Sequence, residues 1–153
     1  MVEILLVIAI IALALASLFG LASFFLDASH LSGQRTQASI LIQEEIEALR
    51  NFRDGTNWYN GLGVVTVGAD YYLGKSSDNP PKWQLIQGQE SVNIFTRKII
   101  FSGVQRDVNS NIVESGGIID SETKKAVATV SWRGKGGDHQ LSISTYFTNW
   151  NGQ

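Results

Sequence analysis

The chain has 153 residues, the size of one ordinary domain with one further element. Twelve lysines and arginines stand against fourteen aspartates and glutamates, and the two signs are equal in number once Glu3 and Asp27 are set aside. Nucleic-acid-binding domains usually have a basic surplus, so this balance gives no support for one. The sequence has no cysteine, which excludes disulfides, thiolate metal sites and cysteine nucleophiles without excluding an extracellular protein of this size.

The first element is an apolar segment over residues 4–26, interrupted only by Ser17, Gly20 and Ser23. At about 1.5 Å rise per residue such a helix spans roughly 34 Å, enough for a hydrocarbon core about 30 Å thick. It is apolar on every side, which predicts a membrane helix over residues 1–26 and not the one-faced helix of a soluble domain. No lysine or arginine precedes Arg35. The basic region of a leader is therefore missing, and we expect that a leader has been removed.

Glu3 separates this segment from a plain membrane anchor. A carboxylate is disfavoured by about 2.5–3.5 kcal/mol at the bilayer centre and by less near the interface, so it usually has a partner. One interpretation is an ion pair with a free N-terminal ammonium, either its own or that of a neighbouring chain. The other is that Glu3 lies among the lipid headgroups and favours the positive end of the helix dipole. The residues alone leave both interpretations open.

The first ten residues, MVEILLVIAI, resemble the start of a mature type IV pilin or type II secretion pseudopilin, and the resemblance covers residues 1–30. It implies that a prepilin peptidase removes a short leader on the cytoplasmic face and methylates the new N-terminus. It also implies that Glu3 pairs with the N-terminal amine of an adjacent subunit during assembly. In these families the glutamate is the fifth mature residue, so we expect two residues ahead of Met1.

The same resemblance draws attention to Gly20. Family members often have a helix-breaking proline seventeen residues after the glutamate, and that position falls on Gly20 here. Glycine inside a helix costs about 1 kcal/mol relative to alanine. Ser17 and Ser23 flank it with hydroxyls that can bond freed carbonyls. We predict that the helix loosens between about Ala12 and Ser23 in a filament; the alternative is a weak but continuous helix.

Residues 27–54 form the amphipathic half of the same predicted helix. Apolar residues recur there at helical spacing, at Leu31, Ala38, Ile42, Ile46 and Leu49, with charged and amide side chains on the other faces. Arg50 and Arg53 in the last turn and the following Gly55 mark its end. A helix over about residues 1–53 would be near 80 Å long. Its C-terminal half is expected to pack on a sheet while the N-terminal half projects, as in the lollipop shape of pilins.

Residues 55–153 alternate at period two between glycine-rich and asparagine-rich turns, which predicts a globular antiparallel sheet and an α+β fold. The predicted strands are residues 64–73, 82–86 (short), 91–101, 125–132 and 141–147. In the last strand Leu141, Ile143 and Phe147 share one face. Residues 134–138 are predicted to join the last two strands as a hairpin loop.

No catalytic arrangement is recognisable, and we expect that the chain is not an enzyme. His30 lies beside the membrane helix and His139 lies in the predicted hairpin, so they do not support a serine triad. The Gly74-Lys75-Ser76 segment lacks the first glycine and the strand-to-helix context of a phosphate-binding loop.

Oxygen-bearing side chains follow one another near residue 110, and no cofactor other than Ca²⁺ is suggested by the sequence. Ca²⁺ takes six to eight oxygen ligands, and the candidate ligands are Asp107, Asn109, Asn111, Glu114 and Asp120. The same residue types are typical of any tight turn, so a hairpin turn is the alternative. Pseudopilins include calcium binders in this region of the fold, a similarity that keeps calcium open.

The interpretation that accounts for most of these features is a structural subunit that is held in the cytoplasmic (inner) membrane and then self-assembles into an extracellular pilus-like filament. Its partners would be further copies of itself, the membrane, a prepilin peptidase and the assembly machinery, with any surface ligand unknown. Aromatic residues such as Trp58, Trp83 and Trp150 serve the core, subunit contacts or ligand capture. The alternatives are a pseudopilin of a secretion or DNA-uptake system and a membrane-anchored binding module that never polymerises.

Overall fold

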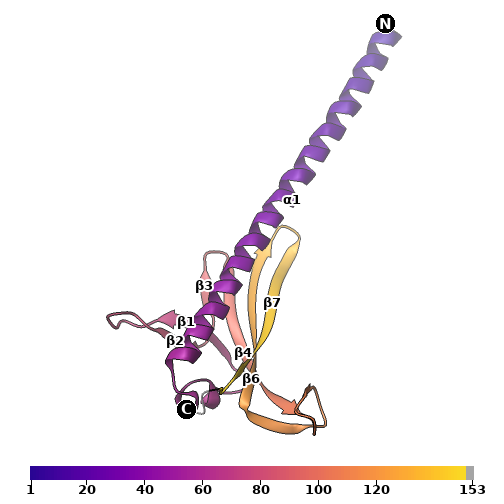
Figure 1. The fold of residues 1–153 in the computed structure, drawn as a ribbon. Helices are drawn as coiled ribbons and strands as arrows, with labels where there is room; N and C mark the ends of the chain where they lie inside the picture. Colours follow the sequence, from indigo (N-terminus) through magenta and orange to yellow (C-terminus); the bar gives the residue numbers. More distant parts are fainter. Residues whose placement is uncertain (151–153) are drawn as a thin grey trace. The chain divides into compact units, whose positions relative to one another are not determined.

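The computed structural model describes residues 1–150 (Figure 1). One helix, α1, runs from Val2 to Gly55 and confirms the long helix predicted for residues 1–53. The chain divides into two compact units, Met1–Gln37 and Ala38–Gln153, and α1 contributes to both. The composition changes near residue 26, whereas the second unit begins at the first helical residue that is buried against the sheet, Ala38.

The first unit consists of α1 alone, and it contains a stretch long and apolar enough to span a membrane. The large apolar side chains from Ile4 to Leu26 are all exposed in the described chain. Contiguous exposed apolar surface of this extent is rare on soluble monomers and marks a surface that contacts lipid or other chains.

The second unit is a seven-stranded antiparallel sheet with the C-terminal part of α1 packed on it. The strands are β1 (Asp70–Lys75), β2 (Trp83–Gln87), β3 (Glu90–Val92), β4 (Phe95–Arg106), β5 (Ile112–Val113), β6 (Ile118–Gly134) and β7 (Gly137–Thr148). The main order is β2-β1-β4-β6-β7, and β3 and β5 also pair with β4. One edge of β4 is thus shared by three short strands, whereas the other edge pairs with β6 along its length. The α+β fold class is confirmed.

The core lies between α1 and this sheet, as the helical spacing predicts. Ala38, Ile42 and Leu49 on α1 are fully buried, and so are Ile99 and Phe101 on β4. Two alanines of β6, Ala126 and Ala128, are also fully buried, which keeps the centre of the sheet flat enough for the helix to approach. Trp58 and Leu62, which follow α1 in the 3-10 helices η1 (Trp58–Asn60) and η2 (Leu62–Val64), close one end of the core.

The predicted strands at residues 82–86, 125–132 and 141–147 are present as parts of β2, β6 and β7. The hairpin between the last two strands is also present, but its loop is shorter than residues 134–138. Gly134 lies opposite Gly137, so the loop between the two strands consists of Lys135 and Gly136. Gly136 and Gly137 have φ values of 102° and 125°, a conformation that glycine adopts without strain.

Two predicted strands are wrong in their extent. Residues 64–73 do not form one strand, because Leu62–Val64 is 3-10 helix and β1 begins only at Asp70. Gly63 is needed there, since a Cβ atom at this position would lie 2.8 Å from Trp58. Residues 91–101 are two strands instead of one: Asn93 has a φ of 56°, and β3 folds back on β4 with Val92 opposite Phe95.

Candidate assembly site and its anchor on the sheet

Glu3 lies in the first turn of α1, with its side chain exposed. The Leu5 N–H donates to the Met1 carbonyl, so the helix is formed from its first possible hydrogen bond. A carboxylate at this end interacts favourably with the helix dipole, and an exposed one is also accessible to a cationic group of another molecule. This position is compatible with both interpretations of Glu3, which stay predictions.

The helix is continuous through Gly20 in this structure. Ser17 Oγ donates to the Ala14 carbonyl at 2.8 Å, whereas Ser23 is an exposed residue of the next turn. A Cβ atom added at Gly20 would have no atom within 4 Å, so the backbone there is open to close approach by another chain. The predicted loosening of the helix concerns the filament and stays a prediction.

Three of the five predicted calcium ligands lie in one turn, which connects β4 to β5. Asp107 Oδ1 accepts hydrogen bonds from the Asn109 and Asn111 backbone N–H groups, at 2.9 and 2.8 Å. Asp107 Oδ2 accepts from Asn111 Nδ2 at 3.1 Å. These hydrogen bonds lower the pKa of Asp107. The structure thus contains the tight turn that was the alternative to a calcium site. Both carboxylate oxygens of Asp107, which a calcium ion would need as ligands, accept hydrogen bonds within this turn.

The other two predicted calcium ligands, Glu114 and Asp120, lie outside the turn that contains Asp107. Glu114 is exposed beyond β5, and Asp120 lies on β6, where its Oδ2 accepts from Arg106 Nε at 2.6 Å. Arg106 also donates to the Ser110 carbonyl at 2.8 Å, so a guanidinium connects the turn to Asp120. Burial acts to raise the pKa of Asp120, but the hydrogen bonds from Arg106, Thr123 and the Glu122 backbone lower it overall. Among residues 1–150, no three His, Cys, Asp or Glu side chains cluster as a metal site.

Calcium binding at this turn stays a prediction with a direct test. If Asp107, Asn109 and Asn111 hold Ca²⁺, calorimetry should show a higher melting temperature in calcium than in a chelator, because a ligand that binds only the folded state stabilises it. Asp107→Asn should abolish the difference, since it removes the charge and retains one acceptor oxygen. Equal melting temperatures of the native chain in both buffers would contradict calcium binding.

A buried ion cluster, which the sequence analysis missed, fixes α1 to the sheet. Glu45 of α1 is 1% exposed, and its Oε2 lies 3.0 Å from Nε of Arg97 on β4. The Arg97 Nε–H is directed to Glu90 of β3, and Nη1 lies 3.3 Å from Glu44. One arginine therefore faces three carboxylates from two elements.

Glu45 also completes the backbone hydrogen bonding of the sheet. The β1–β4 pairing includes only two residue pairs and ends at Tyr71 opposite Ile99. Two residues later the Leu73 N–H is buried, and Glu45 Oε1 accepts from it at 3.0 Å. A buried N–H group without an acceptor is costly. The helix carboxylate therefore takes the place of a β4 carbonyl at the point where the two strands separate.

The two partners respond to burial in different ways. Burial raises the pKa of Glu45, and the Arg97 charge and the Leu73 N–H reduce this rise without cancelling it. Burial acts to lower the pKa of Arg97, but the charge of Glu45, with Glu90 and Glu44, raises it overall. Arg97 thus stays charged, and Glu45 is the member of the pair that titrates more easily.

The sequence contains a signal for both residues. Glu45 stands three residues after Ile42 and four before Leu49, so it falls on the apolar stripe of the helix. Arg97 stands between Phe95 and Ile99 in the period-two pattern of β4, so it falls on the inward face. A charged residue inside an apolar pattern is rarely buried unless it is paired, so each of the two residues is expected to have a partner without the sequence showing which.

A group of exposed apolar side chains, which the sequence analysis did not identify, lies beside the end of β4 that follows the bulge at Gly103 and Val104. We call it the apolar tip: Val108, Ile112, Ile118 and Ile119. Ile112 and Ile118 flank Arg106 from opposite sides, and Ile119 is opposite Gln105. Val108, Ile118 and Ile119 are 96%, 79% and 75% exposed. Ile118 and Ile119 are consecutive residues of β6 and point to opposite faces of the sheet, so the apolar tip is exposed on both faces. Exposed apolar side chains gathered at one end of a sheet are typical of a region that another molecule covers.

Comparisons of the sequence with protein-family models, with curated proteins and with solved structures give no match. The described architecture, a long apolar N-terminal helix followed by an antiparallel sheet, is pilin-like.

Proposed function

We propose that this chain is a structural subunit that is inserted in the cytoplasmic membrane by α1 and polymerises through the same helix into an extracellular type IV pilus-like filament. The observation that carries the proposal is that every large apolar side chain from Ile4 to Leu26 is exposed, on a helix with one carboxylate at its start. A membrane covers such a surface before assembly, and neighbouring copies of the helix cover it afterwards.

The physical basis of assembly is close helix packing. Transferring an apolar helix from lipid into a bundle of like helices gives little hydrophobic gain, because lipid tails are as apolar as leucine. Small residues such as Ala12, Ala16 and Gly20 allow close approach, and an ion pair between Glu3 and a neighbouring amine fixes the stagger. Such head-to-tail contacts do not close, so they generate a helical filament.

The partners in this proposal are further copies of the chain, the membrane and the enzymes of a pilus system, including a prepilin peptidase. A catalytic role is not part of it. His139 stacks on Trp132 with 5.4 Å between ring centroids, a packing role that fits a structural subunit.

Two other functions share this architecture. A pseudopilin would form a short periplasmic rod, and a membrane-anchored binding module would stay monomeric. The apolar tip is a candidate for subunit contacts in a filament, and in a binding module the same four exposed apolar side chains would contact the bound partner.

Electron microscopy of filaments sheared from the cell surface tests the proposal. We expect density in which this sequence can be traced, with the N-terminal helices inside the fibre. Extraction of the chain only as a stable monomer, with no filament under any condition, would contradict it and support the binding module. Short rods seen only on overexpression would support the pseudopilin.

The apolar tip provides a separate prediction about the filament surface. Ile118→Asp should reduce filament yield about tenfold, because it places a charge where a neighbouring subunit removes water. The stability of the monomer should change by no more than about 0.5 kcal/mol, as expected for an exposed site. Filament yield is measured by shearing and quantitative blotting, and stability by thermal denaturation.

The matched control for this prediction is Ile94→Asp. Ile94 is also an exposed isoleucine, but it lies in the β3–β4 turn, away from the tip. We expect normal filament yield from it. An Ile118→Asp chain that forms filaments as well as the control would show that the tip is not covered in the filament.

A further inference from the structure

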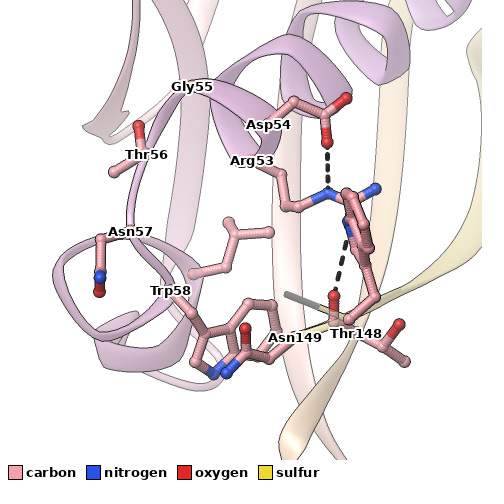
Figure 2. A pocket seen from close by; sticks show the side chains of 10 residues that line it. Arg53, Asp54, Gly55, Thr56, Asn57, Trp58, Thr148 and Asn149 are labelled. Atoms are coloured by element: carbon pink, nitrogen blue, oxygen red, sulfur yellow. Dashed lines mark hydrogen bonds and ion pairs between the residues drawn. The ribbon is translucent and has the colours of Figure 1, made fainter. Parts of the chain in front are cut away.

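A pocket of about 200 Å³ lies where α1 ends, within the second unit (Figure 2). The last turn of α1 and the start of η1 form one side, and the residues at the end of β7 form the other. Two indole rings line it. Trp58 is buried and belongs to the core, whereas Trp150 is 69% exposed. An exposed tryptophan at the rim of a pocket provides a flat apolar face for a ligand.

The charged groups that line this pocket neutralise each other. Arg53 Nε lies 2.8 Å from Asp54 Oδ1, and Arg53 Nη1 donates to the Thr148 carbonyl at 3.4 Å. The Arg53 guanidinium is also 5.9 Å from the centre of the Trp150 ring, at cation–π distance. No other charged residue lines the pocket in the described chain. The pocket therefore has no net charge with which to attract an anion or a cation.

The uncharged polar groups of the pocket are held in fixed orientations. Asn57 Oδ1 accepts from the Tyr59 N–H at 2.9 Å, which directs Asn57 Nδ2 away as a donor. Asn149 donates through Nδ2 and through its backbone N–H to Glu122, which leaves Asn149 Oδ1 as an acceptor. Within residues 1–150 no hydrogen bond uses Asn57 Nδ2 or Asn149 Oδ1. Asn57 and Asn149 both line the pocket, and each has one amide atom, a donor in Asn57 and an acceptor in Asn149, that stays available for a further hydrogen bond.

We propose that this pocket binds a neutral saccharide. A sugar ring has a flat C–H face that packs on an indole, and its rim of hydroxyls both donates and accepts hydrogen bonds. The pocket has an exposed indole ring for the C–H face and amide groups for the hydroxyls, and its two charged residues neutralise each other. It is smaller than the roughly 300–1,000 Å³ of typical ligand sites, so it has room for one sugar ring or the end of a chain.

A nucleotide is the strongest competing ligand, because a base also stacks on tryptophan. Phosphates would need a cationic partner, and the arginine of this pocket is already paired with Asp54. The neutral lining therefore favours a saccharide.

The test uses the full chain as a monomer in a zwitterionic detergent, because detergents with sugar headgroups would compete. Methyl glycosides of glucose, galactose, mannose, N-acetylglucosamine and N-acetylgalactosamine are titrated, and binding is followed by saturation-transfer NMR. We expect saturable binding of at least one of them. The measurement does not require filaments, so its outcome is independent of the polymerisation proposal.

Two substitutions identify the site. Trp150→Ala should weaken the binding about tenfold by removing the stacking face. Asn57→Asp should weaken it to a similar degree, because it retains the oxygen that accepts from Tyr59 and replaces the donor with an acceptor. The matched control is Trp83→Ala: Trp83 is a partly exposed tryptophan of β2 that does not line the pocket, and its removal should leave binding unchanged.

Three results would overturn the proposal. The first is that none of the five glycosides binds. The second is that binding is insensitive to both Trp150→Ala and Asn57→Asp, which would place the sugar elsewhere. The third is that adenosine monophosphate binds at the pocket more tightly than every glycoside, which would assign the site to a nucleotide.

Discussion

Arg97→Met is expected to destabilise the second unit by about 3–5 kcal/mol at neutral pH. Removing one member of a buried ion pair leaves the other charge uncompensated, and this is among the most costly of single substitutions. Glu45 would keep its hydrogen bond from Leu73 but lose the cation 3.0 Å away, and Glu90 would become a second unpaired carboxylate. Urea denaturation of the native and variant chains measures the difference.

The matched control is Arg50→Met, the same substitution in an exposed pair. Arg50 contacts Glu47 one turn away on α1, and both side chains are more than half exposed. Exposed pairs contribute about 0–1 kcal/mol, so the control should lose no more than that. Equal losses from the two variants would show that the buried cluster does not fix the helix to the sheet.

The loss caused by Arg97→Met should depend on pH. The folded pKa of Glu45 already lies above its ordinary value near 4.5, so its contribution favours the fold at low pH and is lost as the pH rises through that pKa. Without Arg97 this pKa rises further. The destabilisation should therefore be smaller at about pH 5 than at about pH 8, because a protonated Glu45 carries no unpaired charge. The same loss at both pH values would contradict this explanation.

A second substitution separates charge from packing. Glu45→Gln retains an oxygen for the Leu73 N–H but removes the buried charge. The double variant Arg97→Met with Glu45→Gln should therefore be more stable than Arg97→Met alone at neutral pH. Neighbours in one network are expected to show such non-additivity.

The long helix and its buried stripe could be predicted because both are local patterns. The uniform apolar segment ends at Leu26, and Ala38, Ile42, Ile46 and Leu49 then repeat at the period of a helix. Neither pattern depends on what the helix contacts. The β6–β7 hairpin was predictable for the same reason, since a glycine-rich turn separates two alternating segments.

The strand boundaries were less predictable, because pairing partners determine them. β6 begins at Ile118, seven residues before its predicted start, since its backbone continues to pair with β4 where the sequence no longer alternates. The break at Asn93 is a single residue with positive φ inside an otherwise regular segment. Glu45 and Arg97 were hidden for a related reason: each residue is anomalous in its own element, and only the folded structure brings the two anomalies together.

Glu3→Ala is expected to give a chain that inserts in the membrane but forms little filament. Insertion should be normal or better, because the substitution removes a carboxylate from an apolar helix. Assembly should fall at least about tenfold, since a charged hydrogen bond contributes about 1.5–3 kcal/mol and 1.4 kcal/mol corresponds to a factor of ten. Membrane fractionation measures the insertion, and electron microscopy of sheared material measures the filament yield.

Glu3→Gln distinguishes the two interpretations of this residue. The amide keeps an oxygen that can accept hydrogen bonds at the start of α1, but it cannot form an ion pair with an amine of a neighbouring subunit. If the charge sets the stagger of the helices, Glu3→Gln should fail to assemble as Glu3→Ala does. Glu47→Ala, which removes an exposed carboxylate from the second half of α1, should assemble normally. Normal filaments from Glu3→Gln would refute the ion pair and show that a polar side chain among the lipid headgroups at the start of α1 is sufficient for assembly.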